Sequence, residues 1–162
     1  MLGKSQKTRS AKKPDIGFNS ARDYFDSLLL PAYRDFAKTP KRASMMEFAR
    51  SAWHLHERLW HDRGKPNKEK FLVDLLRACP ELRLVRDIGD TSKHTELDRR
   101  SVTLARIEGC DGGGIGEEIT IYGSVSRPYR GTLTIVEDDG ARHDPDLVFR
   151  RIVEFWQAEI AK

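Results

Sequence analysis

Residues 79–94, CPELRLVRDIGDTSKH, are the stretch on which the prediction of the fold depends. A proline suits the first turn of a helix, and the apolar positions after Pro80 recur at helical spacing. At about 100° per residue, four polar side chains share about a third of the helix circumference: Arg86, Asp90, Lys93 and His94. The stretch therefore predicts an amphipathic helix from Pro80 to about Leu97, with a polar stripe along one side.

Upstream of this stretch, the sequence predicts three further helical segments. The first begins at residues 19–20, which can cap a helix, and it should kink or break at Pro31, which lacks a backbone donor. The second spans 40–64 and has apolar residues on more than one side, as expected for a helix with neighbours on two sides. A shorter helix follows Asn67. These segments predict a helical bundle.

Beyond Ser101 the period of the apolar residues changes from that of a helix to that of a strand. Three short antiparallel strands are predicted, at 102–107, 118–125 and 132–137. Residues 110–116 are predicted to form a glycine-rich loop, and Asp138-Asp139-Gly140 a turn. Asp144-Pro145 caps a final helix that can cover the sheet.

Together these elements predict an α+β fold: a four- or five-helix N-terminal bundle, a three-stranded antiparallel sheet and a C-terminal helix. Residues 1–17 are predicted to be a disordered basic tail, which could attract RNA or DNA weakly. Residues 18–162 are predicted to form a single domain. Within it the bundle occupies 18–99, the sheet 100–143 and the closing helix 144–162.

Composition points to a cytoplasmic protein. The chain has 162 residues, a formal net charge of +4 and two cysteines, which lack a C-x-x-C spacing. Two such cysteines predict ordinary thiols in a reducing compartment, and Cys79 is expected to be a buried structural residue. No run approaches the roughly 18 apolar residues that a membrane span needs, and the N-terminus has no apolar signal region. A soluble protein without a membrane partner is expected.

The helix at 40–64 carries a second polar stripe at three- and four-residue spacing, made of His54, Glu57, Arg58 and His61. If it meets the first stripe across the bundle, a site forms whose candidate catalytic residues are His94, Arg86, Asp90, Arg58, His54 and His61. In such a site His94 is the predicted base for a 2′-hydroxyl proton, and Arg86 or Arg58 the cation that stabilises the phosphorane. That arrangement predicts RNA cleavage without a cofactor.

Two alternatives remain open for the same residues. His54, Glu57 and His61 offer nitrogen and oxygen donors at helical ligand spacing, so a metal site is one alternative, with Asp90 or His94 as a further ligand. In the other, the stripes form a buried polar network that fixes helix register in a non-catalytic interaction module. The glycine-rich loop lacks the Lys-Ser/Thr of a phosphate loop and is interpreted as a hairpin connection.

The segment at 79–94, with Ala52-Trp53-His54-Leu55, Asp139-Gly140 and Phe155-Trp156, resembles a group of uncharacterised bacterial proteins. These pair a helical bundle with a small C-terminal sheet and a closing helix. The bundle is in turn distantly similar to HEPN domains, which are helical modules of bacterial toxins and antiviral systems. This resemblance implies a metal-independent ribonuclease that acts as a homodimer. Seven residues separate Arg86 from His94, more than the four to six of the HEPN motif.

Overall fold

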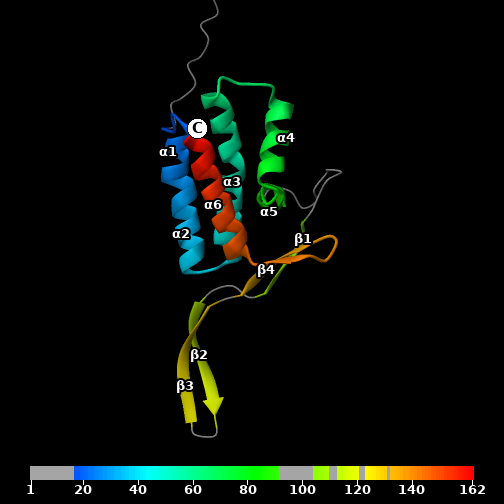
Figure 1. Ribbon diagram of the computed structural model, residues 1–162. Coiled ribbons are helices and arrows are strands. Elements are labelled where there is room, and N and C mark those ends of the chain that lie inside the picture. The colour runs from blue at the N-terminus through cyan, green and yellow to red at the C-terminus, as the bar shows by residue number, and fades with distance from the viewer. Residues whose placement is uncertain (1–16, 92–103, 110–112, 121–122, 131) are drawn as a thin grey trace, which may run out of the picture.

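The computed structural model describes residues 17–91, 104–109, 113–120, 123–130 and 132–162. The predicted α+β fold is confirmed: five α-helices precede a three-stranded antiparallel sheet, and a sixth helix ends the chain. Figure 1 shows that the helices form one body, while the sheet lies at one end of it. The chain therefore has helical and β layers in the order that the sequence predicts.

The first helical segment runs through Pro31 without a break. It consists of α1 (Ala21–Tyr24), the π-helical η1 (Phe25–Leu29) and α2 (Leu30–Lys38), and Ser20 caps it by accepting from the Asp23 N–H at 3.0 Å. The Leu30 N–H donates to the Phe25 carbonyl. A π-turn is wider than an α-turn, so it leaves room for the proline ring. The expected interruption is thus a change of helix type and not a break.

The next three helices lie close to their predicted positions. α3 (Arg42–Asp62) ends before Gly64, which has the positive φ of 74° expected at a helix C-terminus. α4 (Lys68–Ala78) is capped by Asn67, whose side chain accepts from the Lys70 N–H at 2.9 Å. α5 spans Leu82–Thr91. Residues 92–97, the predicted last turns of α5, lie outside the described residues.

The strands differ from the prediction in one respect. β1 (Leu104–Gly109), β4 (Leu133–Glu137) and β5 (Arg142–His143) form the sheet, in the order β1-β4-β5. The strand predicted at 118–125 is wrong, because β2 (Gly113–Thr120) ends and β3 (Gly123–Arg130) begins inside that range, and the two pair antiparallel with each other. Residues 113–116 of the predicted loop are part of β2, and β5 was not predicted.

β1 pairs with β4 next to the helices, and β2 pairs with β3 farther from them (Figure 1). Gly109, at the end of β1, has a φ of 102°, and an added Cβ would lie 1.8 Å from the Thr132 carbonyl oxygen. A glycine is therefore required where β1 meets the start of β4.

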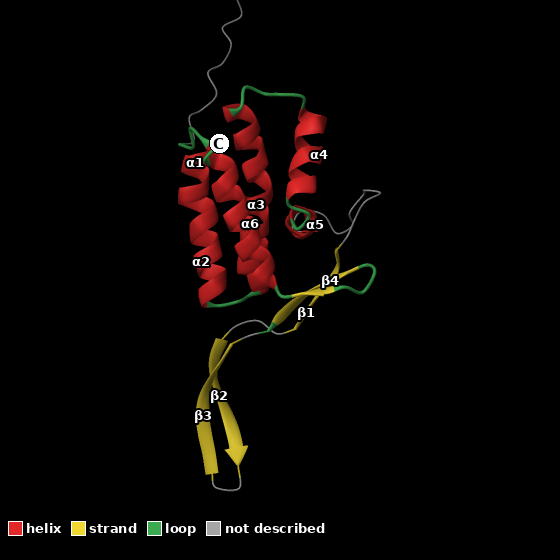
Figure 2. Ribbon diagram, viewed as in Figure 1, coloured by secondary structure: helices red, strands yellow, loops and turns green. Residues whose placement is uncertain are grey.

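The core lies between α6 (Pro145–Ile160) and the helices beside it. Figure 2 shows α6 alongside α2 and α3, and its first residues follow the sheet. The Phe149 ring stacks on Phe48 with 4.1 Å between centroids, and it lies 4.8 Å from Phe36. All three rings, like Trp156, are buried. Burial of such rings is the main stabilising term available to this bundle.

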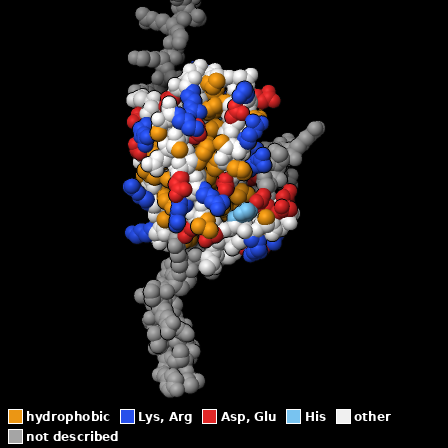
Figure 3. Space-filling view, in the orientation of Figure 1, with side chains coloured by type: hydrophobic (Ala, Val, Ile, Leu, Met, Phe, Trp, Pro, Cys, Tyr) orange, Lys and Arg blue, Asp and Glu red, His pale blue; other side chains and the backbone are white. Residues whose placement is uncertain are grey.

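The visible surface carries both signs of charge. In Figure 3 basic and acidic side chains are interspersed, with apolar side chains between them. No helix within the described ranges has the length and apolar character needed to cross a membrane.

Candidate functional site

α5 crosses α3 at very close range. A Cβ added to Gly89 would lie 3.3 Å from the Arg50 Cα and 3.6 Å from the Ala49 carbonyl carbon. The two backbones approach this closely because Gly89 has no side chain. Arg86 and Asp90, one helical turn before and one residue after Gly89, therefore lie near the middle of α3.

Arg86 contacts the residue next to it. Its Nε lies 3.1 Å from Asp87 Oδ1, and the two side chains are 12% and 0% exposed. A carboxylate without exposed surface needs hydrogen-bonding or ionic partners, because its desolvation is costly. The pair is therefore a buried part of the helix packing. Asp87 is not among the site residues predicted from the sequence. Asp90 is half-buried.

Arg58, the arginine of the second predicted stripe, makes its contacts away from α5. Arg58 Nη1 donates to the Phe18 carbonyl at 3.4 Å, and its guanidinium carbon lies 6.0 Å from the Tyr24 ring centroid. Arg58 thus faces the N-terminal helical segment. His61 is exposed, with its ring against Trp60. Arg58 and His61 follow the α3–α5 crossing by about two turns or more, which explains why their contacts lie elsewhere.

His54 and His94 are the two remaining residues of the predicted site. His54 is half-buried. His94, the predicted base, lies outside the described residues, as does Lys93. The structure thus brings Arg86 and Asp90 to the crossing with α3 and places Arg58 and His61 away from it.

The alternative metal set is not assembled as a ligand cluster. Across the described ranges, no three His, Cys, Asp or Glu side chains come together as ligands for an ion. Glu57 and His61 are exposed, whereas His54 is half-buried. The three residues have helical spacing along α3, but their side chains do not converge on one position where an ion could bind.

His56 and Cys79 are buried groups with shifted pKa values. Burial lowers the pKa of His56, whose Nδ1 lies 2.5 Å from the Trp53 carbonyl and donates to it in the neutral ring. Burial, together with the nearby Glu81 carboxylate, raises the pKa of the Cys79 thiol to about 12. Cys79 is buried, as expected for a structural thiol. Both groups are neutral parts of the packing near pH 7.

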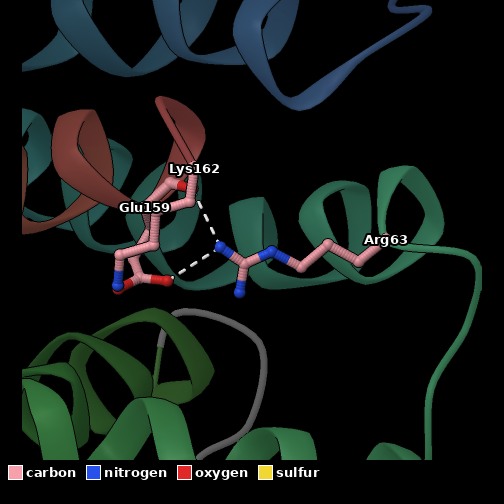
Figure 4. Close-up of polar contacts among 3 residues, drawn as sticks. All are labelled: Arg63, Glu159 and Lys162. Atoms are coloured by element: carbon pink, nitrogen blue, oxygen red, sulfur yellow. Dashed lines mark hydrogen bonds and ion pairs between the residues drawn. The ribbon is translucent and has the colours of Figure 1, made fainter.

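A polar cluster joins the C-terminal ends of α3 and α6 (Figure 4). Arg63 Nη2 donates to the carbonyl and to the carboxylate Oε2 of Glu159, each at 2.9 Å. Lys162 Nζ lies 2.5 Å from the other carboxylate oxygen. Burial acts to raise the pKa of Glu159, but hydrogen bonds from Lys162 and Arg63 outweigh it and lower that pKa. These contacts hold the C-terminal end of α3 against the C-terminal end of α6.

A pocket of about 480 Å³ opens where the sheet meets the helices. Its walls come from α2, from Pro40 between α2 and α3, from strands β4 and β5 with the residue before β4, and from the cap and first residues of α6. The lining residues are Phe36, Pro40, Thr132, Leu133, Thr134, Arg142, His143, Asp144, Pro145 and Asp146. The volume is within the range of small-molecule sites, about 300–1,000 Å³.

Several polar groups on the pocket wall have no partner within the described part of the chain. The hydroxyls of Thr132 and Thr134 make no hydrogen bond there, and His143 is held through Nε2 by Glu137 Oε1, which leaves Nδ1 unused. Asp144, an exposed residue, uses Oδ1 to accept from the Asp146 N–H at 2.9 Å, and its Oδ2 has no partner among the described residues. Apolar walls with a few polar groups open to a ligand are what a small-molecule site offers.

This pocket was not predicted from the sequence. Asp138-Asp139-Gly140 and Asp144-Pro145 were recognised as a turn and a helix cap, and both are confirmed. The pocket also needs Asp144-Pro145 to lie near Phe36 and Pro40, which comes from the tertiary packing of α6 on α2 and has no local sequence signal. The nearest available signal was the concentration of Thr, Arg, His and Asp between 132 and 146.

No protein-family model matches this chain, and comparisons with curated proteins and with solved structures find no match.

Proposed function

We propose that this protein is a non-catalytic binding module that takes a small polar ligand, or a polar side chain of a partner, into the pocket between the sheet and α6. The observation that carries the proposal is the pocket itself. It combines an apolar floor with unused polar groups of Thr132, Thr134, His143 and Asp144.

The non-catalytic half of the proposal is supported by the contacts of the α5 polar stripe. Arg86 is nearly buried beside the fully buried Asp87, and Arg58 is engaged by Phe18 and Tyr24. A phosphoryl group approaching from solvent needs an accessible cation. These arginines instead contribute to helix packing, in keeping with the polar network that the sequence analysis offered as one alternative.

The competing proposal is a HEPN-like nuclease that acts on RNA through Arg86, Asp90 and His94. It is tested by incubating the purified chain with a pool of single-stranded and structured RNA, with and without chelator. Our proposal predicts no cleavage by the folded protein. Cleavage that survives the chelator and disappears in Arg86→Gln and His94→Ala, at matched folding, would replace it with the ribonuclease.

The binding half is tested by NMR. The isotope-labelled chain is screened against a mixture of neutral, cationic and anionic polar fragments, with the methyl signals of Thr132 and Thr134 as reporters. We expect fragments to shift these signals in the wild type and in Val73→Phe, which alters an exposed position on α4. The pocket-filling Thr134→Phe, followed at the remaining Thr132 methyl signal, should lose the response while keeping its melting temperature within a few degrees. No response to any fragment in the wild type would contradict the proposal.

A further inference from the structure

His143 contributes a ring nitrogen to the pocket wall. Its Nε2 contacts Glu137 Oε1, and an ionised carboxylate only accepts hydrogen bonds, so Nε2 carries the proton. In the neutral ring Nδ1 is then an acceptor. His143 lines the pocket, and this second nitrogen has no partner among the described residues. In its neutral form the imidazole therefore offers an acceptor to a ligand.

The N-terminal end of α6 also lines the pocket. The positive end of a helix favours an anion, but here two carboxylates of the chain, Asp144 and Asp146, already occupy the first positions. Asp144 Oδ1 caps the helix and Oδ2 is unused. The helix end therefore adds an acceptor to the pocket and has little attraction left for an anionic ligand.

Arg142 is the one arginine among the described residues that line the pocket. Arg142 Nη2 donates to Glu108 Oε2 at 2.7 Å, so its charge is already compensated. The hydrogen bond from Arg142, with another from Arg106, lowers the pKa of Glu108, which keeps that carboxylate ionised. The remaining walls are apolar: Phe36, Pro40, Leu133 and Pro145. Such walls suit the methylene stem of a long side chain whose head is charged.

We infer that the pocket selects a primary ammonium group on an aliphatic stem, from a free alkylamine or from a lysine side chain of a peptide. The acceptors at His143 Nδ1 and Asp144 Oδ2, with the threonine hydroxyls, match the three donors of an ammonium group. This inference rests on the proposed function, because it names the ligand class of the same pocket.

The test is an NMR titration of the isotope-labelled full chain. The probes are n-butylamine and the peptide acetyl-Gly-Lys-Gly-amide, each beside a neutral counterpart, n-butanol or the norleucine peptide, with butyrate as the anion. The informative variant is Asp144→Asn, because asparagine caps a helix as well as aspartate but lacks the charge. Asp138→Asn, an exposed turn position that does not line the pocket, is the matched control.

We expect a cationic probe to bind more tightly than its neutral counterpart and than butyrate. Asp144→Asn should weaken that binding by about fivefold, as for loss of one partly exposed charge contact, while Asp138→Asn leaves it unchanged. A preference for the amine over the lysine peptide identifies a small molecule as the source, and the reverse identifies a protein partner. Equal binding of neutral and cationic probes, unaffected by Asp144→Asn, would overturn the ammonium assignment and leave the binding module standing. No shift of pocket signals by any probe would overturn both.

Discussion

Asp87 places a carboxylate inside the protein, one residue after an arginine that is itself nearly buried. Removing one partner of a buried ionic pair typically costs about 3–5 kcal/mol, because the other charge stays desolvated. We therefore expect Asp87→Asn to lower the free energy of unfolding by about 3 kcal/mol. The matched control is Arg83→Gln, at an exposed position of the same helix, which should change it by less than about 0.5 kcal/mol. Urea denaturation measures both. Equal stability of the two variants would show that Asp87 is not part of the packing.

His56 gives the stability of the fold a pH dependence. Its pKa is lowered by burial, so the folded state binds fewer protons than the unfolded state below about pH 6.5. The stabilisation from the neutral ring is present above that pH and is lost as the pH falls toward the folded-state pKa. The wild type should therefore lose more stability between pH 7.5 and 5.5 than His56→Gln. A difference in urea midpoint between the two proteins that is the same at both pH values would contradict this.

Cys79 should be unreactive in the native protein. Its pKa of about 12 leaves almost no thiolate at pH 8, and the thiolate is the reactive form. We expect iodoacetamide to label the peptide containing Cys79 slowly in buffer and rapidly in urea, as followed by mass spectrometry. Equally rapid labelling of that peptide in buffer would show that the thiol is neither buried nor shifted.

At the scale of elements, α5 and α3 cross with their backbones close together at Gly89. A larger side chain at Gly89 meets the backbone of Arg50 and Ala49, which cannot move aside as a flexible side chain would. We expect Gly89→Val to lower the free energy of unfolding by more than about 2 kcal/mol, because overpacking against backbone outweighs the small gain in helix propensity of valine over glycine. Ala78→Val places the same side chain at an exposed position at the end of α4, where it meets no such backbone. Similar thermal stability of the two variants would mean that the crossing is looser than described.

The helices were predictable because their caps and stops are local. Ser20, Asn67 and Asp144 accept backbone hydrogen bonds where the sequence predicts helix starts, and Gly64 ends α3. The β2–β3 hairpin was missed for an equally local reason. Its two connecting residues are Ile121-Tyr122, which lack the Asn, Asp or Gly that mark a two-residue turn. Apolar alternation continues through them, so the sequence resembled one strand. β5 has two residues and is too short for any pattern.

At the scale of the whole molecule, the candidate site depends on contacts between distant segments. Helical spacing correctly placed Arg86 and Asp90 on one helix, but it did not give the position at which α5 crosses α3. That position depends on Gly89 meeting Ala49 and Arg50, a fit between two surfaces. The pocket likewise needs residues from 36–40 and 132–146 to meet. Local periodicity carries no information about either juxtaposition.

The central claim is that the pocket between the sheet and α6 is the binding site of this protein. The most direct measurement is a crystallographic soak of the full chain with the neutral, cationic and anionic fragments, followed by difference density maps. We predict fragment density between Phe36, Thr134 and His143, with a polar group of the fragment near Asp144. Fragments that gather at another surface while this pocket holds none would contradict the account.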